Sequence, residues 1–227
     1  MPLDEQVLDR RTLSAQVYSQ LEQKVLSGAL PPGTRLSEEC IAETFSVSRS
    51  PAREALLELE RVGFAIRDGS RDRMVAIPTR EMIAERYEMW WIVDIGRTYL
   101  ASLQSTPEDI AELRSFLDRA VRAVKSRDSR RFRTASEKFH EKIRRGCRNS
   151  FVNEAGSACN LVLRWFEALY DRSPEMSEQT IEEHTQILDA YERKDLGALA
   201  VAIQGHTART RERILKCVDG PEAVAND

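Results

Sequence analysis

The segment from residue 37 to residue 64 has the pattern of two short helices joined by a tight turn. Ser37 is suited to begin the first helix, because a serine hydroxyl accepts one of the backbone N–H groups left over at a helix start. Ser46 and Val47 mark the turn, and Ser48 precedes a second helix with Pro51 in its first turn, where a missing N–H costs little. This arrangement predicts a helix-turn-helix, whose second helix enters the major groove of DNA.

The second helix separates apolar from basic side chains. Its inward stripe consists of Ala52, Ala55, Leu56 and Leu59. Arg49 and Arg53 are four residues apart and share another face. Arginine is the side chain that best pairs bidentately with O6 and N7 of guanine, so this face is the expected reading surface.

The flanking segments complete a winged helix-turn-helix. Residues 13–27 carry apolar side chains at helical spacing, and two strand-like runs follow Gly63, with a hairpin turn signal at 68–70. We therefore expect three helices and a β-hairpin wing in residues 1–78. Arg71 and Arg73 would lie at the wing and meet phosphate or the minor groove; the alternative is an ordinary solvated hairpin.

From Thr79 onwards the sequence predicts helices and no strands. Pro78 and Thr79 mark the domain boundary, because proline ends the strand and threonine can cap a helix. The expected fold class is mainly α: a winged helix-turn-helix followed by an all-α bundle at 79–218, with a frayed tail at 219–227. The expected helices are 79–103, 107–127, 129–146, 149–171, 175–193 and 196–218.

Charge and composition limit the remaining possibilities. The net charge is −3, and residues 1–78 hold ten Lys and Arg against twelve Asp and Glu, so only the placement of the arginines indicates DNA binding. There is no apolar run long enough to span a membrane, and the N-terminus is too polar for a signal peptide. The four cysteines lack zinc-site spacing, so we expect reduced thiols in a cytoplasmic protein.

The helical region contains all three histidines of the chain. His140, His184 and His206 each fall on the apolar stripe of a different expected helix. Three inward imidazoles from one bundle could meet around a metal ion, since imidazole is a common ligand for zinc and nickel. Spacing alone leaves the alternative open that each is a separately satisfied core histidine.

The first domain resembles the GntR family of bacterial transcription regulators. Three segments carry the resemblance: Pro-Gly-Thr-Arg-Leu (32–36), Ser-Arg-Ser-Pro-Ala-Arg-Glu-Ala-Leu (48–56) and Leu-Glu-Arg-Val-Gly-Phe (59–64). The resemblance implies that Arg35, Arg49 and Arg53 contact DNA. It also implies that Ser48 and Ser50 lie near the phosphates.

Residues 80–217 resemble the effector domain of the FadR-like subfamily of these regulators. The resemblance rests on Phe139-His140, on the run 183–190 and on His206. It implies a divalent metal such as zinc, nickel or manganese, held by three His and one Asp, with a small carboxylate bound beside it. The aspartate position is occupied by Ser136, and Glu137 is one residue out of register, so three ligands carry over and the fourth does not.

Three more residues are candidates for binding the effector. Where many family members have an arginine and an acid in the first helix of this domain, this chain has Trp90 and Asp94. Arg164 follows in an apolar helix, beside Trp165, and could meet a carboxylate. The alternatives are a core tryptophan and an arginine whose head group reaches solvent.

Together these features predict a repressor whose affinity for DNA is controlled by a small-molecule effector. We expect a homodimer on an inverted-repeat operator, because the two-fold symmetry of a protein is mirrored in its site. One alternative is a metal-dependent enzyme built on the three histidines, with Glu137 or Glu141 as its base. Another is an architectural DNA binder without an effector.

Overall fold

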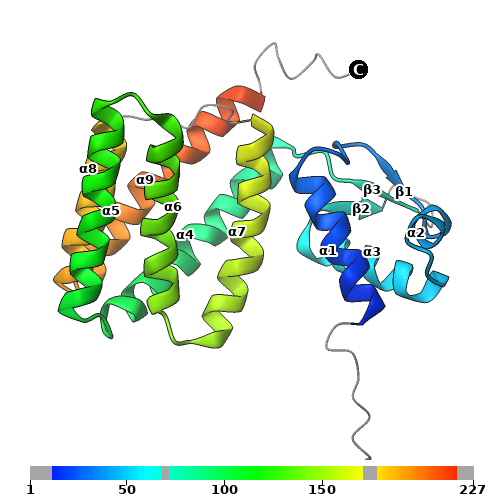
Figure 1. Ribbon diagram of the computed structural model, residues 1–227, viewed down its shortest axis with the longest axis horizontal. Coiled ribbons are helices and arrows are strands. Elements are labelled where there is room, and N and C mark those ends of the chain that lie inside the picture. The colour runs from blue at the N-terminus through cyan, green and yellow to red at the C-terminus, as the bar shows by residue number, and fades with distance from the viewer. Residues whose placement is uncertain (1–11, 68–71, 171–177, 219–227) are drawn as a thin grey trace, which may run out of the picture. The chain divides into compact units, whose positions relative to one another are not determined.

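The computed structural model describes residues 12–67, 72–170 and 178–218, and the chain divides into two compact units between Pro78 and Thr79 (Figure 1). Arg71, the hairpin turn at 68–70 and the tail at 219–227 lie outside the described residues. The sequence-based expectation of a winged helix-turn-helix followed by an all-α domain is confirmed.

The first unit consists of three helices and a small antiparallel sheet. The helices are α1 (Leu13–Leu26), α2 (Glu38–Phe45) and α3 (Arg49–Val62), and the strands are β1 (Arg35–Leu36), β2 (Ala65–Arg67) and β3 (Arg73–Val75). The strand order is β1-β3-β2, so β3 is the central strand. The hairpin of β2 and β3 was expected, whereas β1 was not, because two residues are too few to show strand alternation.

Local chemistry explains where these helices begin and end. The Ser37 hydroxyl accepts the Cys40 amide at 3.1 Å at the start of α2. Ser46 ends that helix in the left-handed conformation, at φ 53°, and Gly63 does the same for α3 at φ 101°. Ser48 is the N-cap residue of α3, but its side chain makes no capping hydrogen bond. The core contains Val17, Leu21, Ala52, Leu56, Leu59 and Phe64.

The second unit is helical throughout its described residues. Its helices are α4 (Arg80–Ser102), α5 (Pro107–Lys125), α6 (Ser129–Gly146), α7 (Ser150–Tyr170), α8 (Glu178–Glu192) and α9 (Leu196–Val218). Their ends lie within two residues of the expected ones, except at the start of α8, where residues 175–177 of the expected helix lie outside the described residues. None of the helices in the described part of the chain is both long enough and apolar enough to cross a membrane.

Capping residues also set the helix starts in this unit. Thr79 accepts the Met82 amide at 3.2 Å at the start of α4. At the start of α5, the Thr106 hydroxyl accepts the Asp109 amide at 3.2 Å, while the Asp109 carboxylate accepts the Thr106 amide at 2.9 Å. This reciprocal capping box satisfies two N–H groups that would otherwise lack a partner.

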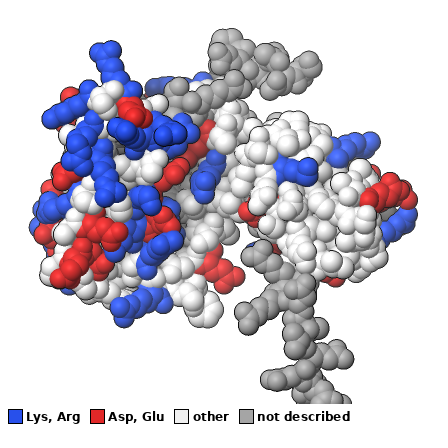
Figure 2. Space-filling model, in the orientation of Figure 1, with Lys and Arg blue, Asp and Glu red and all other residues white. Residues whose placement is uncertain are grey.

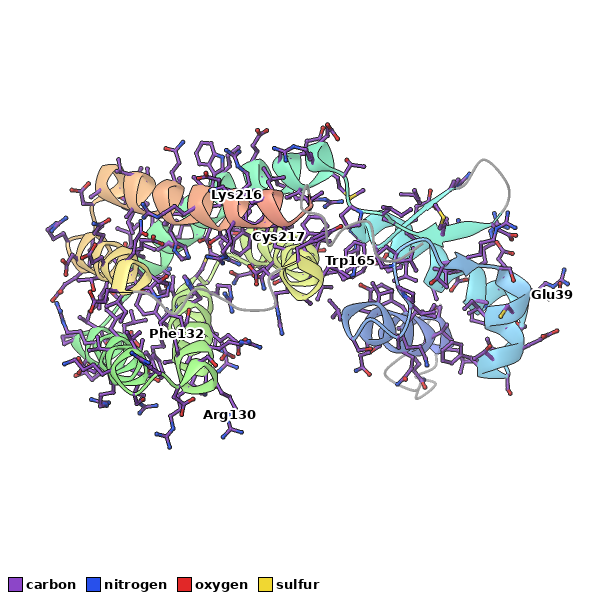
Figure 3. All side chains as sticks on the ribbon, turned by 90° about the horizontal axis from the view of Figure 1, so that it is seen from above. Glu39, Arg130, Phe132, Trp165, Lys216 and Cys217 are labelled. Carbon is purple, nitrogen blue, oxygen red and sulfur yellow. The ribbon has the colours of Figure 1, made fainter. Side chains whose placement is uncertain are left out.

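The core of the bundle lies between α4, α5, α6, α8 and α9. Its fully buried side chains include Leu113, Phe139, Leu188 and Leu199. The two faces of α6 have different surroundings, because Arg130 points outwards while Phe132 is buried among the helices (Figure 3). The inward stripe of α6 thus brings His140 to the interior, beside Phe139.

Candidate functional site

The N-terminal part of α3 presents the residues expected to read DNA. Ser48, Arg49, Ser50 and Arg53 are all exposed there, and the apolar stripe of α3 faces the core. Arg35 is exposed on β1, which pairs with the wing strand β3. The first unit therefore offers its arginines on a surface, as an interface with DNA requires.

Two of these arginines are paired with acids of α2. Arg49 Nη2 lies 2.6 Å from Glu39 Oε1, and Arg53 Nε lies 4.0 Å from Glu38 Oε1. The side chains of Arg49 and Glu39 are 72% and 67% exposed, and such surface pairs contribute only about 0–1 kcal/mol. Arg49 can therefore exchange Glu39 for a nucleic acid acceptor at little cost.

Arg73, which was expected to meet DNA, is buried in the structure. Its side chain is only 4% exposed, and its Nε donates to Glu60 Oε2 at 2.8 Å. Arg67 contacts the other oxygen of the same carboxylate at 3.1 Å. Successive side chains of a strand point to opposite faces of the sheet, and the Arg73 side chain lies on the face of the central strand β3 that packs against α3. Its ion pair with Glu60 therefore joins the sheet to α3, and the side chain is not placed to contact a phosphate.

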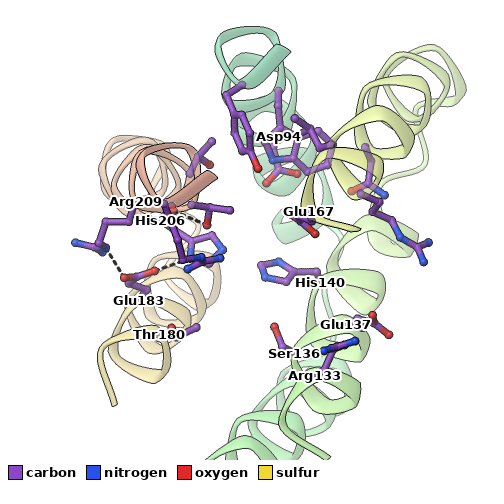
Figure 4. A pocket seen from close by; sticks show the side chains of 18 of the residues that line it. Asp94, Arg133, Ser136, Glu137, His140, Glu167, Thr180, Glu183, His206 and Arg209 are labelled. Atoms are coloured by element: carbon purple, nitrogen blue, oxygen red, sulfur yellow. Dashed lines mark hydrogen bonds and ion pairs between the residues drawn. The ribbon is translucent and has the colours of Figure 1, made fainter. Parts of the chain in front are cut away.

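A cavity of about 700 Å³ in the second unit is lined by α4, α6, α7, α8 and α9 (Figure 4). All four residues proposed for the effector line it: Trp90, Asp94, Ser136 and Arg164. His140 and His206 also line it, while His184 is fully buried. The volume is in the range typical of small-molecule sites.

The three histidines meet at this cavity, although they come from α6, α8 and α9. The Nε2 atoms of His140 and His184 lie 3.0 Å apart. The ligand atoms of all three imidazoles lie within 4.8 Å of one another. The expectation that they converge is therefore confirmed, and the alternative of three separate core histidines is not what the fold produces.

Glu183 orients His206, a role that the sequence analysis did not assign. Glu183 Oε2 lies 2.6 Å from His206 Nδ1, and the other carboxylate oxygen pairs with Arg209. The carboxylate is buried and immediately precedes His184 in the sequence, which is the signal that could have revealed it. A carboxylate on Nδ1 leaves Nε2 of His206 available as a metal ligand.

Burial determines the protonation of the other two imidazoles. Desolvation lowers the pKa of His140 and of His184 well below the ordinary histidine value, and the neighbouring imidazoles lower the pKa further. Nδ1 of His184 is buried without a hydrogen-bond partner among the described residues. Both rings are therefore neutral at neutral pH, the form in which histidine binds metals.

The geometry of the cluster fits a divalent metal. Two imidazole nitrogens on a tetrahedral zinc ion lie about 3.3 Å apart, given Zn–N bonds of roughly 2.0–2.1 Å. Ser136 lies one turn before His140 on α6, and both Ser136 and its neighbour Glu137 line the cavity (Figure 4). The described cluster of metal-ligand side chains thus contains three histidines and no carboxylate.

Asp94 and Trp90 line the cavity, and Arg97 contacts both of them. Asp94 Oδ1 accepts from Arg97 Nη2 at 2.6 Å, and the guanidinium lies 4.8 Å from the centre of the Trp90 ring. Arg97 is 1% exposed, and a Cβ atom at Gly156 would lie 2.5 Å from its Nη1. The Asp94 charge is therefore already neutralised by Arg97, which lies near the same stripe of the helix and to which sequence reasoning gave no role.

Arg144 brings a further positive charge to the cavity, one turn after His140 on α6. Burial lowers the pKa of Arg144, and the positive charge of Arg97 lowers it further. A half-buried guanidinium beside another arginine is costly unless an anion neutralises it. Sequence reasoning did not identify Arg144 as a cavity residue, because the charged groups around it come from other helices that only the fold brings together.

A winged helix-turn-helix followed by a helical domain with a polar cavity defines the class of transcription regulators that combine a DNA-binding and a sensory domain. Residues 13–71 match the model of bacterial regulatory proteins of the gntR family, and residues 87–209 match the FCD domain. The chain belongs to the GntR family of bacterial transcription regulators and carries an FCD domain.

Relatives agree with this assignment. The gluconate operon transcriptional repressor of Bacillus subtilis (strain 168) is 28% identical, with 82% of this chain and 75% of the repressor covered. The probable D-xylose utilization operon transcriptional repressor of Paenarthrobacter nicotinovorans is 27% identical, with 88% of each chain covered. The structure of Escherichia coli McbR/YncC has the same fold, with a TM-score of 0.66, 22% identity and coverage of 91% and 98%. These proteins are regulators, so the metal-dependent enzyme is set aside.

Proposed function

We propose that this regulator is a repressor controlled by a small acidic effector, which binds in the cavity beside the three histidines. The observation that carries the proposal is the convergence of His140, His184 and His206 at one wall of a cavity of about 700 Å³. Many helical cores contain histidines, but three imidazoles with adjacent nitrogens form a metal-binding arrangement.

The three histidines would hold a divalent ion such as zinc, nickel or manganese. The ion would supply a Lewis acid that binds one carboxylate oxygen of the effector. Glu183 would keep the His206 ring oriented for this role. Since Ser136 is neutral where the family has an aspartate, we expect weaker metal binding, with water or effector completing the coordination shell.

The charges around the cavity support an acidic effector. Three of the five acids that line it are paired with cations: Asp94 with Arg97, Glu183 with His206 and Arg209, and Glu141 with Arg145. Arg144 and Arg164 line the same cavity from α6 and α7. An effector carboxylate beside Arg144 would neutralise a half-buried cation, and arginine matches carboxylate geometry well.

The names of the relatives suggest where to begin the search for the effector. One relative represses a gluconate operon and another is named for D-xylose utilization. Gluconate is a sugar acid, and its carboxylate and hydroxyl groups match a metal ion and a polar cavity. We therefore place sugar acids first among the candidates.

Operator recognition would use the exposed residues of α3 and β1. Arg35, Arg49 and Arg53 would contact DNA, with Ser48 and Ser50 near the phosphates, in a homodimer bound to an inverted repeat. The effector would change the affinity by binding one arrangement of the dimer more tightly than another. The side chain of Arg71 would contribute from the wing.

The first experiment measures metal content per chain in tag-free protein by mass spectrometry, beside His184→Ala. About one ion per chain in the wild type, absent from the variant, is the expected result. A surface-histidine control is not possible in a chain with three histidines, so Glu182→Gln, an exposed neighbour on α8, serves as the matched control.

The second experiment titrates sugar acids and other small carboxylates against the protein bound to a labelled operator. Release of the operator by one of them, weakened in Arg144→Gln, would support the proposal. An architectural DNA binder is the alternative, and it predicts neither metal nor any response to a compound that occupies the cavity.

A further inference from the structure

A second groove lies between the C-terminal part of α5 and the N-terminal part of α6. Its volume is about 630 Å³, and none of its lining residues among the described ones also lines the histidine cavity. Small side chains, Ala123 and Ala135, lie at its base and are buried in a cluster with Phe132. Long side chains from α5 and from α6 line the two sides of the groove, because residues three or four positions apart on a helix share one face with these alanines.

Five of the lining residues are basic, and none is acidic. They are Arg119, Arg122, Arg130, Arg131 and Lys138. The segment 119–138 holds eight Lys and Arg against two acids, in a chain whose net charge is −3. Figure 2 shows these basic side chains gathered over the end of the bundle where α5 and α6 are joined. This segment is thus strongly basic in a chain that is acidic overall.

Few of these charges are neutralised internally. Arg131 Nε lies 3.3 Å from Asp128 Oδ2, and the guanidinium of Arg119 lies 5.4 Å from the centre of the Phe116 ring. Within the parts of the chain that the structure describes, Arg122, Arg130 and Lys138 form no ion pair. Like charges held around one groove repel one another, so a multivalent anion there would relieve that repulsion.

The N-terminus of α6 lies at the groove and is capped by the Asp128 carboxylate. Arg130 and Arg131 are in the first turn of α6, which contains no acid. The N-terminus of a helix is positive and disfavours cations, so these arginines are placed against the usual preference. Arg131 is compensated by its pair with Asp128, whereas Arg130 forms no ion pair among the described residues, so its charge is available to an anion.

We propose that the groove between α5 and α6 binds a small molecule with at least two phosphate groups. Arginine forks match phosphate oxygens bidentately, and five cations can neutralise several phosphate charges. A concave site with an apolar base and a volume of about 630 Å³ favours a small ligand over the extended backbone of a nucleic acid. The site is independent of the effector proposed for the histidine cavity.

Calorimetry with tripolyphosphate and the full-length protein tests this proposal. We expect saturable binding that weakens at least tenfold in the double variant Arg122→Gln with Arg130→Gln. The matched control, Arg148→Gln with Arg193→Gln, removes the same charge from exposed positions elsewhere in the second unit and should stay within twofold of the wild type. Circular dichroism checks that both variants retain the helical fold.

Further arms of the experiment separate the other sources of binding. Loss of tripolyphosphate binding in Arg144→Gln, but not in the groove variant, would assign the ligand to the histidine cavity and overturn the proposal. Equal weakening in the charge-matched control would show a general effect of charge and would also overturn it. Tighter binding of citrate than of tripolyphosphate would also overturn the proposal, because it would show no preference for phosphate groups. The proposal would likewise be overturned if the groove variant lost affinity only for non-operator DNA.

Discussion

At the scale of single residues, the exposed arginines of α3 are held by weak ion pairs that DNA can replace. Arg49 and Glu39 illustrate this, since both are exposed and 2.6 Å apart. Arg73 shows the opposite behaviour, because its buried guanidinium is bound to the Glu60 carboxylate. Breaking this ion pair would leave a buried charge without a partner, which is costly. Burial, and not residue type, therefore decides which arginine is available to DNA.

Replacing Arg49 by alanine should lower operator affinity by roughly 1–3 kcal/mol if the guanidinium makes a bidentate contact with a base. Fluorescence anisotropy with a labelled operator measures the change. Arg61→Ala is the control, because Arg61 lies at the other end of α3 and is paired with Glu58. An unchanged preference for operator over random DNA in Arg49→Ala would contradict the assignment.

Replacing Glu39 by glutamine should leave operator affinity equal or higher. The variant removes the acid that Arg49 must leave before it contacts DNA, and it also removes one negative charge from the protein surface. The same anisotropy assay applies, with Glu43→Gln, another exposed acid of α2, as the control. A clear loss of affinity in Glu39→Gln alone would mean that the pair positions Arg49 for binding.

Cys159 should resist alkylation in the folded protein. Burial raises the pKa of its thiol to about 11, and the thiol donates to the Arg86 carbonyl at 3.4 Å. At pH 8 only about one thiol in a thousand is then ionised, and the thiolate is the reactive form. Peptide mass spectrometry after iodoacetamide treatment should show Cys40 and Cys217 modified and Cys159 protected until denaturant is added. Equal rates for all three would contradict the described packing.

At the scale of helices and strands, side chains at the ends decide where each element begins. The α5 start combines Thr106, Pro107 and Asp109 in one capping box. The same Asp109 carboxylate lies 2.9 Å from Lys142 of α6, so the cap also joins two helices. A change there should affect both the helix and its packing.

Thr106→Ala should lower the free energy of unfolding by about 1 kcal/mol, because the Asp109 amide loses its hydroxyl partner. Urea denaturation followed by circular dichroism measures the difference. Thr185→Ala is the matched control, since that exposed hydroxyl only bonds back to the Ile181 carbonyl within α8. The same destabilisation in both variants would argue against a specific role for the cap.

At the scale of the whole molecule, the chain joins a domain that reads DNA to one that holds a cavity of polar and charged residues. In the regulation that we propose, the two domains are coupled through the dimer. A single copy of α3 contacts too few bases for high specificity, which is why a symmetric operator is expected.

Two chains should bind one operator duplex. An operator cut to one half-site should bind at least tenfold more weakly than the complete inverted repeat, because the second contact of a dimer is intramolecular. Analytical ultracentrifugation with labelled DNA gives the stoichiometry, and a duplex of equal length with a scrambled second half-site is the control. One chain per duplex, with equal affinity for both, would exclude the dimer.

The sequence by itself determined the helices, their caps, the helix-turn-helix and the inward position of the three histidines. These features depend on neighbouring residues, because capping and helical periodicity act over a few positions. The same local information placed Ser48, Arg49, Ser50 and Arg53 on the exposed start of α3.

Only the tertiary structure decided which distant residues meet. The three residues of β3 are too few to reveal which face is buried, so Arg73 was assigned to DNA until the sheet order placed it against Glu60. The pairing of Glu183 with His206 joins two helices, as does the closeness of Arg97 to Gly156. Such contacts depend on how helices pack, and sequence periodicity says which face of a helix is buried but not which residue faces it.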